Sequence, residues 1–97
     1  MEDLKTKQES KVQRPKQYGV VFLNDDFTTM DFVTETIVRF LGKSVEEANH
    51  LTLEIHGRGQ ALVGGPYTLE IAETKSYQCQ HFAREREQPL MVKLKEL

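Results

Sequence analysis

The stretch YGVVFLNDDFTTMDFV, residues 18–33, passes from an apolar run through three polar residues into the start of a helix. Its first part, residues 18–23, is β-branched and aromatic, which predicts a strand that is buried on both faces or partly covered by a helix. Asn24, Asp25 and Asp26 follow, so the strand delivers a carboxamide and two carboxylates to one edge of the fold. Held together at the end of an apolar strand, these groups form a patch of negative potential that suits a cation, either a metal ion or an ammonium group.

Helix and strand signals predict two further strands and three helices. Each expected helix starts at a hydroxyl residue that can cap it and stops near a glycine or a proline. Ser44 and Glu47 fit a capping box, and Gly57 is the expected stop of that helix. The helices are expected from residue 28 or 29 to about 41, from 44 to 57 and from 69 to about 87, and the strands at 18–23, 60–63 and 90–94, with Gly64-Gly65-Pro66 as a turn. The order βααβαβ predicts an α+β fold, a small three-stranded antiparallel sheet covered on one side by three helices.

Apolar residues at helical spacing predict the buried face of each helix. The expected inward residues are Val33, Ile37, Phe40 and Leu41 in the first helix, Ala48, Leu51, Thr52 and Ile55 in the second, and Ile71, Ala72, Tyr77 or Cys79, Phe82 and Ala83 in the third. Thr52 is the polar exception on the second face.

Residues 1–17 differ in composition from the rest of the chain. Besides Met1 they contain only Leu4 and Val12 as sizeable aliphatic residues. Such a segment buries too little surface to offset the entropy lost on ordering, so we expect a flexible N-terminal extension followed by one folded core, residues 18–97. The extension is either a frayed terminus or a tail that a partner engages.

Composition excludes several classes of protein. The chain has 97 residues, a formal charge of −2 and a single cysteine, Cys79. This charge gives no basic footprint for nucleic acid, and one cysteine forms neither an internal disulfide nor a thiolate metal site. With no apolar run of membrane-spanning length and no secretory signal, we expect a soluble intracellular protein without membrane attachment. No long apolar surface stripe is left over, which favours a monomer.

The polar patch after the first strand has three interpretations. Asp25 and Asp26 with His56 could bind a divalent metal, as in a small metal-dependent hydrolase, although a calcium-loop spacing is absent. Asn24 and Asp25 could simply form Asx turns that shape the entry to the helix. The patch could also bind an ammonium group. No nucleophile motif accompanies it, so we expect no catalytic residue, and binding is favoured over reaction.

Several separated motifs resemble the ClpS family, whose members hand proteins with destabilising N-terminal residues to a Clp AAA+ unfoldase and its peptidase. The resemblance spans about residues 18–95. It rests on the run from Asn24 to Val33, the helix end Ile55-His56, the run Ala72-Glu73-Thr74-Lys75, and Ala83-Arg84-Glu85 with Pro89-Leu90. A generic interaction domain that does not read a free N-terminus is the remaining alternative.

The resemblance implies a site and a partner surface. Asn24, Asp25 and His56 would bind the α-ammonium group and first peptide group of a substrate, with no metal and no cofactor. The adjoining pocket would accept Leu, Phe, Tyr or Trp and would be lined by Leu23, Thr28, Met30, Val33, Thr52, Ile55 and Leu90. Met30 would exclude β-branched residues. Thr52 departs from the methionine common in the family, which predicts a preference for aromatic residues over Leu.

Delivery is also implied. Glu70, Glu73, Thr74 and Lys75 would face an unfoldase of the ClpA or ClpC type, and residues 1–17 would enter its pore. Bacterial cytosol and plastid stroma both suit the family, and the lack of an obvious transit peptide favours the cytoplasm.

Overall fold

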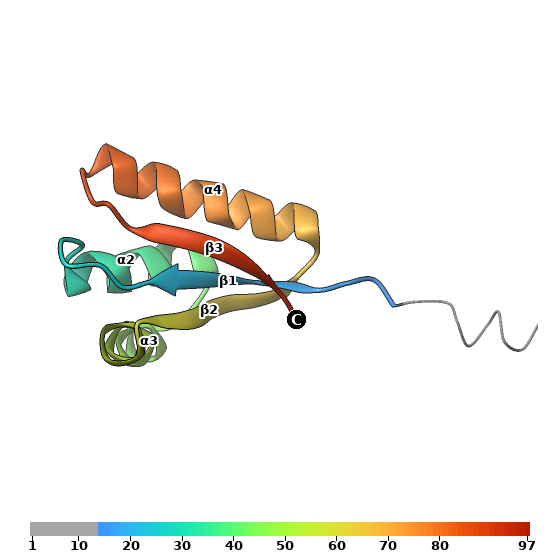
Figure 1. Cartoon of the computed structure of the whole chain (residues 1–97), viewed down its shortest axis with the longest axis horizontal. Coiled ribbons are helices and arrows are strands. Elements are labelled where there is room, and N and C mark those ends of the chain that lie inside the picture. The colour runs from blue at the N-terminus through green and yellow to red at the C-terminus, as the bar shows by residue number, and fades with distance from the viewer. Residues whose placement is uncertain (1–13) are drawn as a thin grey trace, which may run out of the picture.

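The central strand of the sheet is the apolar run, residues 18–23, that comes first in the predicted order of elements. The computed structural model describes residues 14–97, so residues 1–13, most of the expected extension, lie outside the described part. The elements are β1 (Tyr18–Leu23), α2 (Met30–Leu41), α3 (Val45–Arg58), β2 (Gln60–Tyr67), α4 (Leu69–Glu85) and β3 (Met91–Glu96). β1 lies between β2 and β3 and is antiparallel to both, which confirms the predicted α+β fold (Figure 1).

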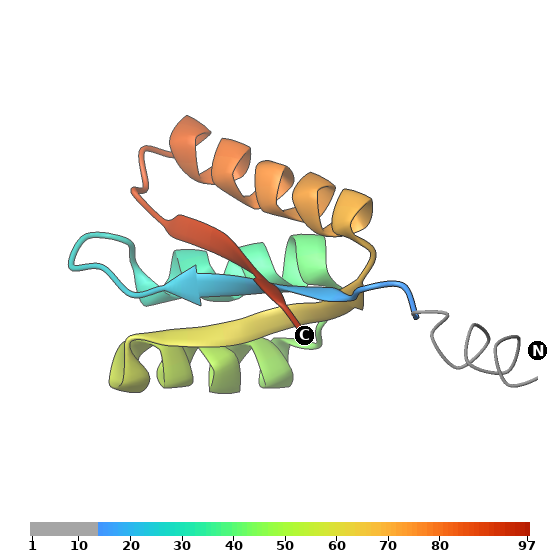
Figure 2. The same ribbon diagram turned by 45° about the vertical axis from the view of Figure 1, so that its right-hand side comes forward.

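The three helices pack on one face of this sheet. Figure 2 shows α2 behind the strands, with α4 on one side of it and α3 on the other, and α2 contacts both of these helices. Val20 and Phe22 of β1 are fully buried in the core beneath the helices. Val21 points to the opposite face and is still only 2% exposed, because its cross-strand neighbours Leu62 and Lys93 flank it. The prediction of a strand buried on both faces is confirmed.

The helix starts follow the predicted caps, but one stop is different. Thr29 caps α2 and Ser44 caps α3 with a complete capping box. The expected stop at Gly57 is wrong, because α3 continues through it to Arg58. Gly59 ends the helix in the left-handed region, with φ of 95°, and its N–H donates to the carbonyl of Ile55. A helix can end at either glycine, and this helical hydrogen bond shows that α3 continues past Gly57 and ends at the second one.

The Gly64-Gly65-Pro66 segment does not end the second strand as predicted. β2 continues through it to Tyr67, and its register against β1 shifts there. A Cβ added at Gly64 would lie 2.9 Å from the Tyr67 hydroxyl oxygen and 3.1 Å from a methyl group of Leu41. Gly64 is thus needed for close packing along the strand, rather than for a turn.

The inward face of α4 uses Cys79 and not Tyr77. Cys79 is fully buried, and burial raises the pKa of its thiol to about 12. Tyr77, the other of the two expected alternatives, is exposed; Ile71 is exposed as well, so that predicted core position is wrong. α4 also stops at Glu85, two residues before the expected end. In the other helices, the predicted core residues Phe40 and Leu51 are only partly buried.

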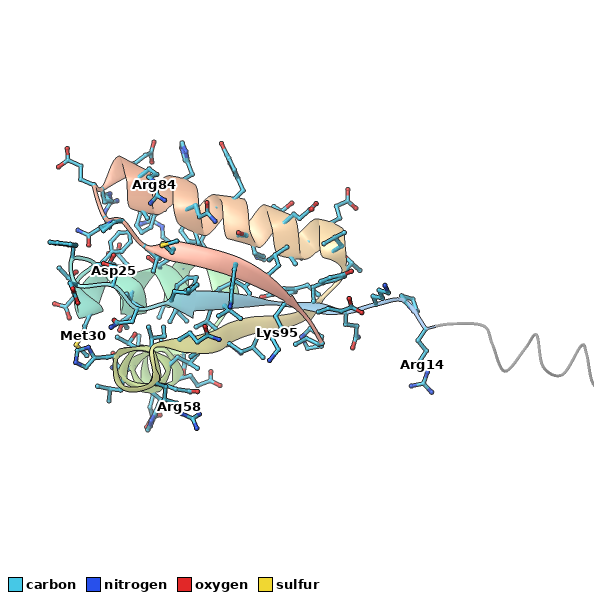
Figure 3. All side chains as sticks on the ribbon, in the orientation of Figure 1. Arg14, Asp25, Met30, Arg58, Arg84 and Lys95 are labelled. Carbon is cyan, nitrogen blue, oxygen red and sulfur yellow. The ribbon has the colours of Figure 1, made fainter. Side chains whose placement is uncertain are left out.

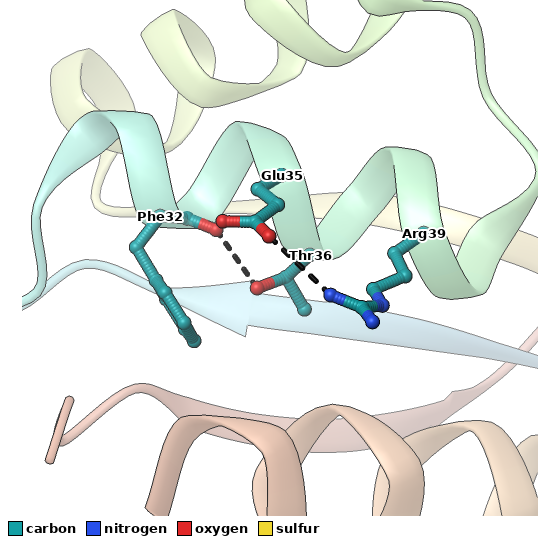
Figure 4. A network of polar contacts seen from close by, with 4 residues as sticks. All are labelled: Phe32, Glu35, Thr36 and Arg39. Carbon is teal, nitrogen blue, oxygen red and sulfur yellow. Dashed lines mark hydrogen bonds and ion pairs between the residues drawn. The ribbon is translucent and has the colours of Figure 1, made fainter. Parts of the chain in front are cut away.

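The middle of α2 buries a polar residue, Thr36, without leaving it unpaired. The Thr36 hydroxyl donates to the carbonyl of Phe32 over 2.8 Å, while Glu35 and Arg39 form an exposed ion pair at 3.4 Å (Figure 4). Among residues 14–97, every buried side-chain nitrogen or oxygen has a hydrogen-bond partner. Within the same residues, no helix combines the length and the apolar character needed to cross a membrane.

Candidate functional site

A cavity of about 370 Å³ lies where β1 runs into α2 and α3 ends. Its lining is Asn24, Asp25, Asp26, Phe27, Thr28, Thr29, Met30, Val33, Thr52, Ile55 and His56. Figure 3 shows Asp25 and Met30 at this end of the molecule. We call Asn24, Asp25 and His56 the polar rim, and Met30, Val33, Thr52 and Ile55 the pocket wall. The structure therefore brings the expected polar and apolar groups to one cavity.

Asp25 organises the loop between β1 and α2. One carboxylate oxygen accepts the N–H groups of Phe27 and Thr28, at 2.8 and 2.6 Å, and the other accepts the Thr28 hydroxyl at 2.7 Å. Partial burial raises the pKa of Asp25, but these hydrogen bonds lower it further, so the net pKa lies below its ordinary value. A carboxylate has about four acceptor positions, so one remains open after these bonds. The Asx-turn interpretation is thus correct for Asp25, and it leaves room for a ligand.

The other two members of the polar rim come from the end of β1 and the end of α3. The backbone N–H of Asn24 donates to the carbonyl of Gly59 over 2.8 Å, which ties the end of β1 to the end of α3. His56 lies in the last turn of α3 and is exposed at the same cavity. The side chain of Asn24 is also exposed. Two further side chains with acceptor atoms therefore line the same cavity as the Asp25 carboxylate.

The pocket wall is formed by α2 and α3. Val33 and Ile55 are buried, while Met30 is 41% exposed and stands in the first turn of α2. Thr52 is only 4% exposed. Its hydroxyl donates to the carbonyl of Ala48 over 2.9 Å and lies 2.7 Å from the hydroxyl of Thr34 on α2. Since a hydroxyl has one proton, Thr34 is the donor in the second bond.

The hydroxyl of Thr52 is thereby fully engaged between the two helices. Thr52 was the polar exception on the predicted apolar face, and its hydroxyl is satisfied by one hydrogen bond to Thr34 of α2 and one to Ala48 of its own helix. Thr52 fills this part of the wall with a smaller side chain than the methionine expected at this position. Its hydroxyl proton is already donated to Ala48, so it offers the cavity no free donor.

Two predicted pocket residues do not line the cavity. Leu90 is fully buried in the core, and Leu23 is partly buried at the end of β1. Phe27 and Thr29 line the cavity although the sequence did not assign them. Phe27 is 79% exposed. The available signal in the sequence was an aromatic residue placed among polar residues, between Asp26 and Thr28.

The expected partner surface is separate from the cavity. Glu70, Glu73 and Thr74 are exposed and Lys75 is partly buried in the first two turns of α4. Figure 1 shows the start of α4 at the end of the molecule opposite the loop between β1 and α2.

A metal site would need a set of ligands, and none is formed in the part of the chain that the structure describes. Within residues 14–97 no group of three or more His, Cys, Asp or Glu side chains is arranged to hold an ion. Asp25, Asp26 and His56 line one cavity without forming such a group.

Comparison with known proteins gives a consistent result. Residues 13–93 match the family described as ATP-dependent Clp protease adaptor protein ClpS. The ClpS adapter of Vibrio atlanticus is 41% identical over 95 residues, covering 98% of this chain and 89% of that protein. The ClpS adapter of Hydrogenovibrio crunogenus is 44% identical over 84 residues, covering 87% of this chain and 80% of that protein. Agrobacterium tumefaciens ClpS2 bound to L-phenylalaninamide superimposes with a TM-score of 0.82 at 32% identity, covering 87% of this chain and all of that one.

Proposed function

Because the chain belongs to the ClpS family of adaptors for the ATP-dependent Clp protease, we propose that it selects substrates by a free α-amino group and a bulky hydrophobic N-terminal side chain. It is an adaptor and not an enzyme, and an adaptor of this kind has two partners, a Clp AAA+ unfoldase and the proteins to be degraded. Proteins that begin with Leu, Phe, Tyr or Trp are the proposed substrates.

The observation that carries this proposal is the union of the polar rim and the pocket wall in one cavity. In an N-terminal residue the ammonium group and the side chain leave the same Cα, so a ligand that satisfies both surfaces must present both groups within a few ångströms. L-phenylalaninamide, the molecule bound by Agrobacterium tumefaciens ClpS2, has a free amino group beside a benzyl side chain. The same two groups are present in a substrate that begins with Phe, so the ligand of that protein supports the proposal.

The polar rim reads the ammonium group in our proposal. An ammonium presents three donors, and the rim offers the side-chain carbonyl of Asn24, the open position on Asp25 and a ring nitrogen of His56. Acetylation removes the positive charge and two of the three donors. An acetylated substrate therefore leaves acceptors of the rim unpaired.

The pocket wall selects the side chain. Burying a Leu or Phe side chain contributes about 2–3 kcal/mol, enough to favour it over small or polar residues. Met30, partly exposed in the first turn of α2, is proposed to exclude β-branched residues by crowding their Cβ. Selection thus combines attraction in the pocket with exclusion at its mouth.

Delivery uses other parts of the chain. We propose that Glu70, Glu73, Thr74 and Lys75 contact an unfoldase of the ClpA or ClpC type, while the extension, residues 1–17, enters its pore. Residues 18–97 are the recognition core in this scheme, which acts as a monomer. The relatives named above are bacterial, and this supports a location in bacterial cytoplasm.

Fluorescence anisotropy tests the proposal with four labelled peptides that begin with free or acetylated Phe or Leu. We expect binding of the free peptides and a loss of at least about a hundredfold on acetylation. Addition of a chelator should change nothing. Equal binding of free and acetylated peptides would identify an interaction domain that does not read the N-terminus. A loss of binding on addition of chelator would instead favour a metal site.

A further inference from the structure

The start of α2 lacks the side-chain acceptor that completes the capping box at the start of α3. In α3 the N–H of Ser44 donates to the Glu47 carboxylate over 3.2 Å, and the Ser44 hydroxyl accepts the N–H of Glu47 over 3.1 Å. In α2 the Thr29 hydroxyl accepts the N–H of Phe32 over 3.1 Å. Phe32 has no acceptor to return to the N–H of Thr29, so the reciprocal bond of a capping box cannot form within α2.

Gln88 supplies this missing acceptor from another part of the fold. The N–H of Thr29 donates to the side-chain carbonyl of Gln88 over 3.1 Å, across 59 positions of sequence. Gln88 lies between α4 and β3. The capping box of α2 is thus completed by tertiary structure.

The segment that carries Gln88 is itself firmly held. The N–H of Gln88 donates to the carbonyl of Ala83 over 2.8 Å. The guanidinium of Arg84 donates to the carbonyls of Gln88 and Leu90, at 3.1 and 3.4 Å, and Leu90 is fully buried. Figure 3 shows Arg84 on the part of α4 nearest to Asp25. Gln88 therefore offers its acceptor from a fixed position.

Thr29 connects Gln88 to the site. It follows Thr28, whose N–H and hydroxyl both donate to Asp25, and it precedes Met30 of the pocket wall. Gln88 is absent from the lining of the cavity. We propose that Gln88 is a positioning residue for N-terminal recognition: through Thr29 it fixes the loop that presents Asp25 and the first turn that presents Met30. This inference rests on the proposed function.

Two substitutions at Gln88 and one at Gln80 test the role. Gln88→Met keeps the length of the side chain and removes the strong acceptor, whereas Gln88→Glu keeps an acceptor. Gln80→Met is the matched control, because the Gln80 amide donates to the carbonyl of Val92 over 3.2 Å and joins α4 to β3 without contacting the loop. The measurements are peptide affinity by anisotropy and exchange of the Thr29 amide proton by NMR in the absence of peptide.

We expect Gln88→Met to bind free-amino Phe and Leu peptides about three- to tenfold more weakly, by the same factor for both, and to exchange the Thr29 amide faster. Gln88→Glu should keep both peptide affinity and Thr29 amide exchange at their wild-type values. Gln80→Met should lower the melting temperature and leave affinity and Thr29 exchange unchanged.

The inference is overturned if Thr29 exchange is unchanged in Gln88→Met, or if it rises while affinity stays at the wild-type value. It is also overturned if Gln88→Glu binds as weakly as Gln88→Met, since any change of side chain would then have the same effect. Failure of the wild-type chain to distinguish free from acetylated peptides would instead refute the proposed function, and Thr29 exchange would still report on the cap.

Discussion

The polar rim and the pocket wall line the same cavity, but different forces hold them in place. Asp25 is fixed by hydrogen bonds within an exposed loop, and that loop is tied to Gly59 and Gln88 by single bonds. Val33, Thr52 and Ile55 are held by burial between α2 and α3. Changes at the rim should therefore decide whether a substrate binds, and changes in the wall should decide which side chain is preferred.

Replacing Asp25 should break the rim most severely. Asp25→Ala removes three loop hydrogen bonds and the open acceptor for the ammonium group, so we expect peptide affinity to fall by about a hundredfold or more. Asp26→Ala is the matched control, because Asp26 carries the same charge at the same cavity. It should weaken binding only a few-fold, in anisotropy at equal ionic strength. Equal losses for the two variants would mean that charge alone, and not the Asp25 geometry, attracts the ligand.

His56 tests the part of the rim that comes from α3. His56→Ala removes one acceptor without disturbing the loop, and we expect an affinity loss of about tenfold for Phe and Leu peptides alike. His50, on the same helix and exposed outside the cavity, provides the control. A loss on His50→Ala as large as that on His56→Ala would contradict the assignment.

The sequence predicted the rim better than the details of the wall, for a physical reason. Strands and helix ends are encoded by neighbouring residues: the rim residues Asn24 and Asp25 directly follow the first strand, and His56 stands near the predicted end of a helix. The family resemblance implied that Leu90 lines the pocket, but an apolar residue can equally lie in the core, and there Leu90 is fully buried.

Features that depend on tertiary contacts could not be predicted. The end of α3 at Gly59 and not Gly57 accompanies the bond from the Asn24 N–H to the Gly59 carbonyl, and β2 continues through Gly64 where it packs closely against Leu41 of α2. The bond between Thr29 and Gln88 spans 59 positions and has no local signal.

Thr52 is where the wall can be changed without touching the rim. Thr52→Met enlarges the side chain and removes the partner of Thr34, so the pocket should narrow. We expect the ratio of Phe to Leu affinities to fall by about three- to tenfold, measured with both peptides in one titration series. Leu53→Met, at an exposed neighbouring position outside the lining, should leave the ratio unchanged. Equal ratios for wild type and Thr52→Met would refute the role of Thr52 in specificity.

The low pKa of Asp25 predicts an acid-dependent loosening of the loop. Because the folded pKa lies below the ordinary value of 3.8, the ionised group stabilises the fold above that value, and the contribution is lost as the pH falls through the folded pKa. Asp25→Asn cannot accept the Thr28 hydroxyl at its amide nitrogen. The melting temperatures of wild type and Asp25→Asn should therefore differ at pH 6 and converge toward pH 3 or below. A difference that stays constant over this range would contradict the prediction.

The smallest effect is expected where the wall is joined by its one polar bond between helices. Thr34→Val removes the donor to Thr52 but leaves Thr52 bonded to the Ala48 carbonyl, so no buried donor loses its acceptor. The free energy of unfolding should fall by about 0.5–1 kcal/mol, measured by urea denaturation, with peptide affinity unchanged. A double-mutant cycle with Thr52→Val separates this bond from the other contacts of each side chain. Zero coupling in that cycle would show that the bond between the two hydroxyls contributes nothing to stability. A loss of affinity in Thr34→Val alone would show that this bond also shapes the pocket for the peptide, against the separation of wall and rim drawn above.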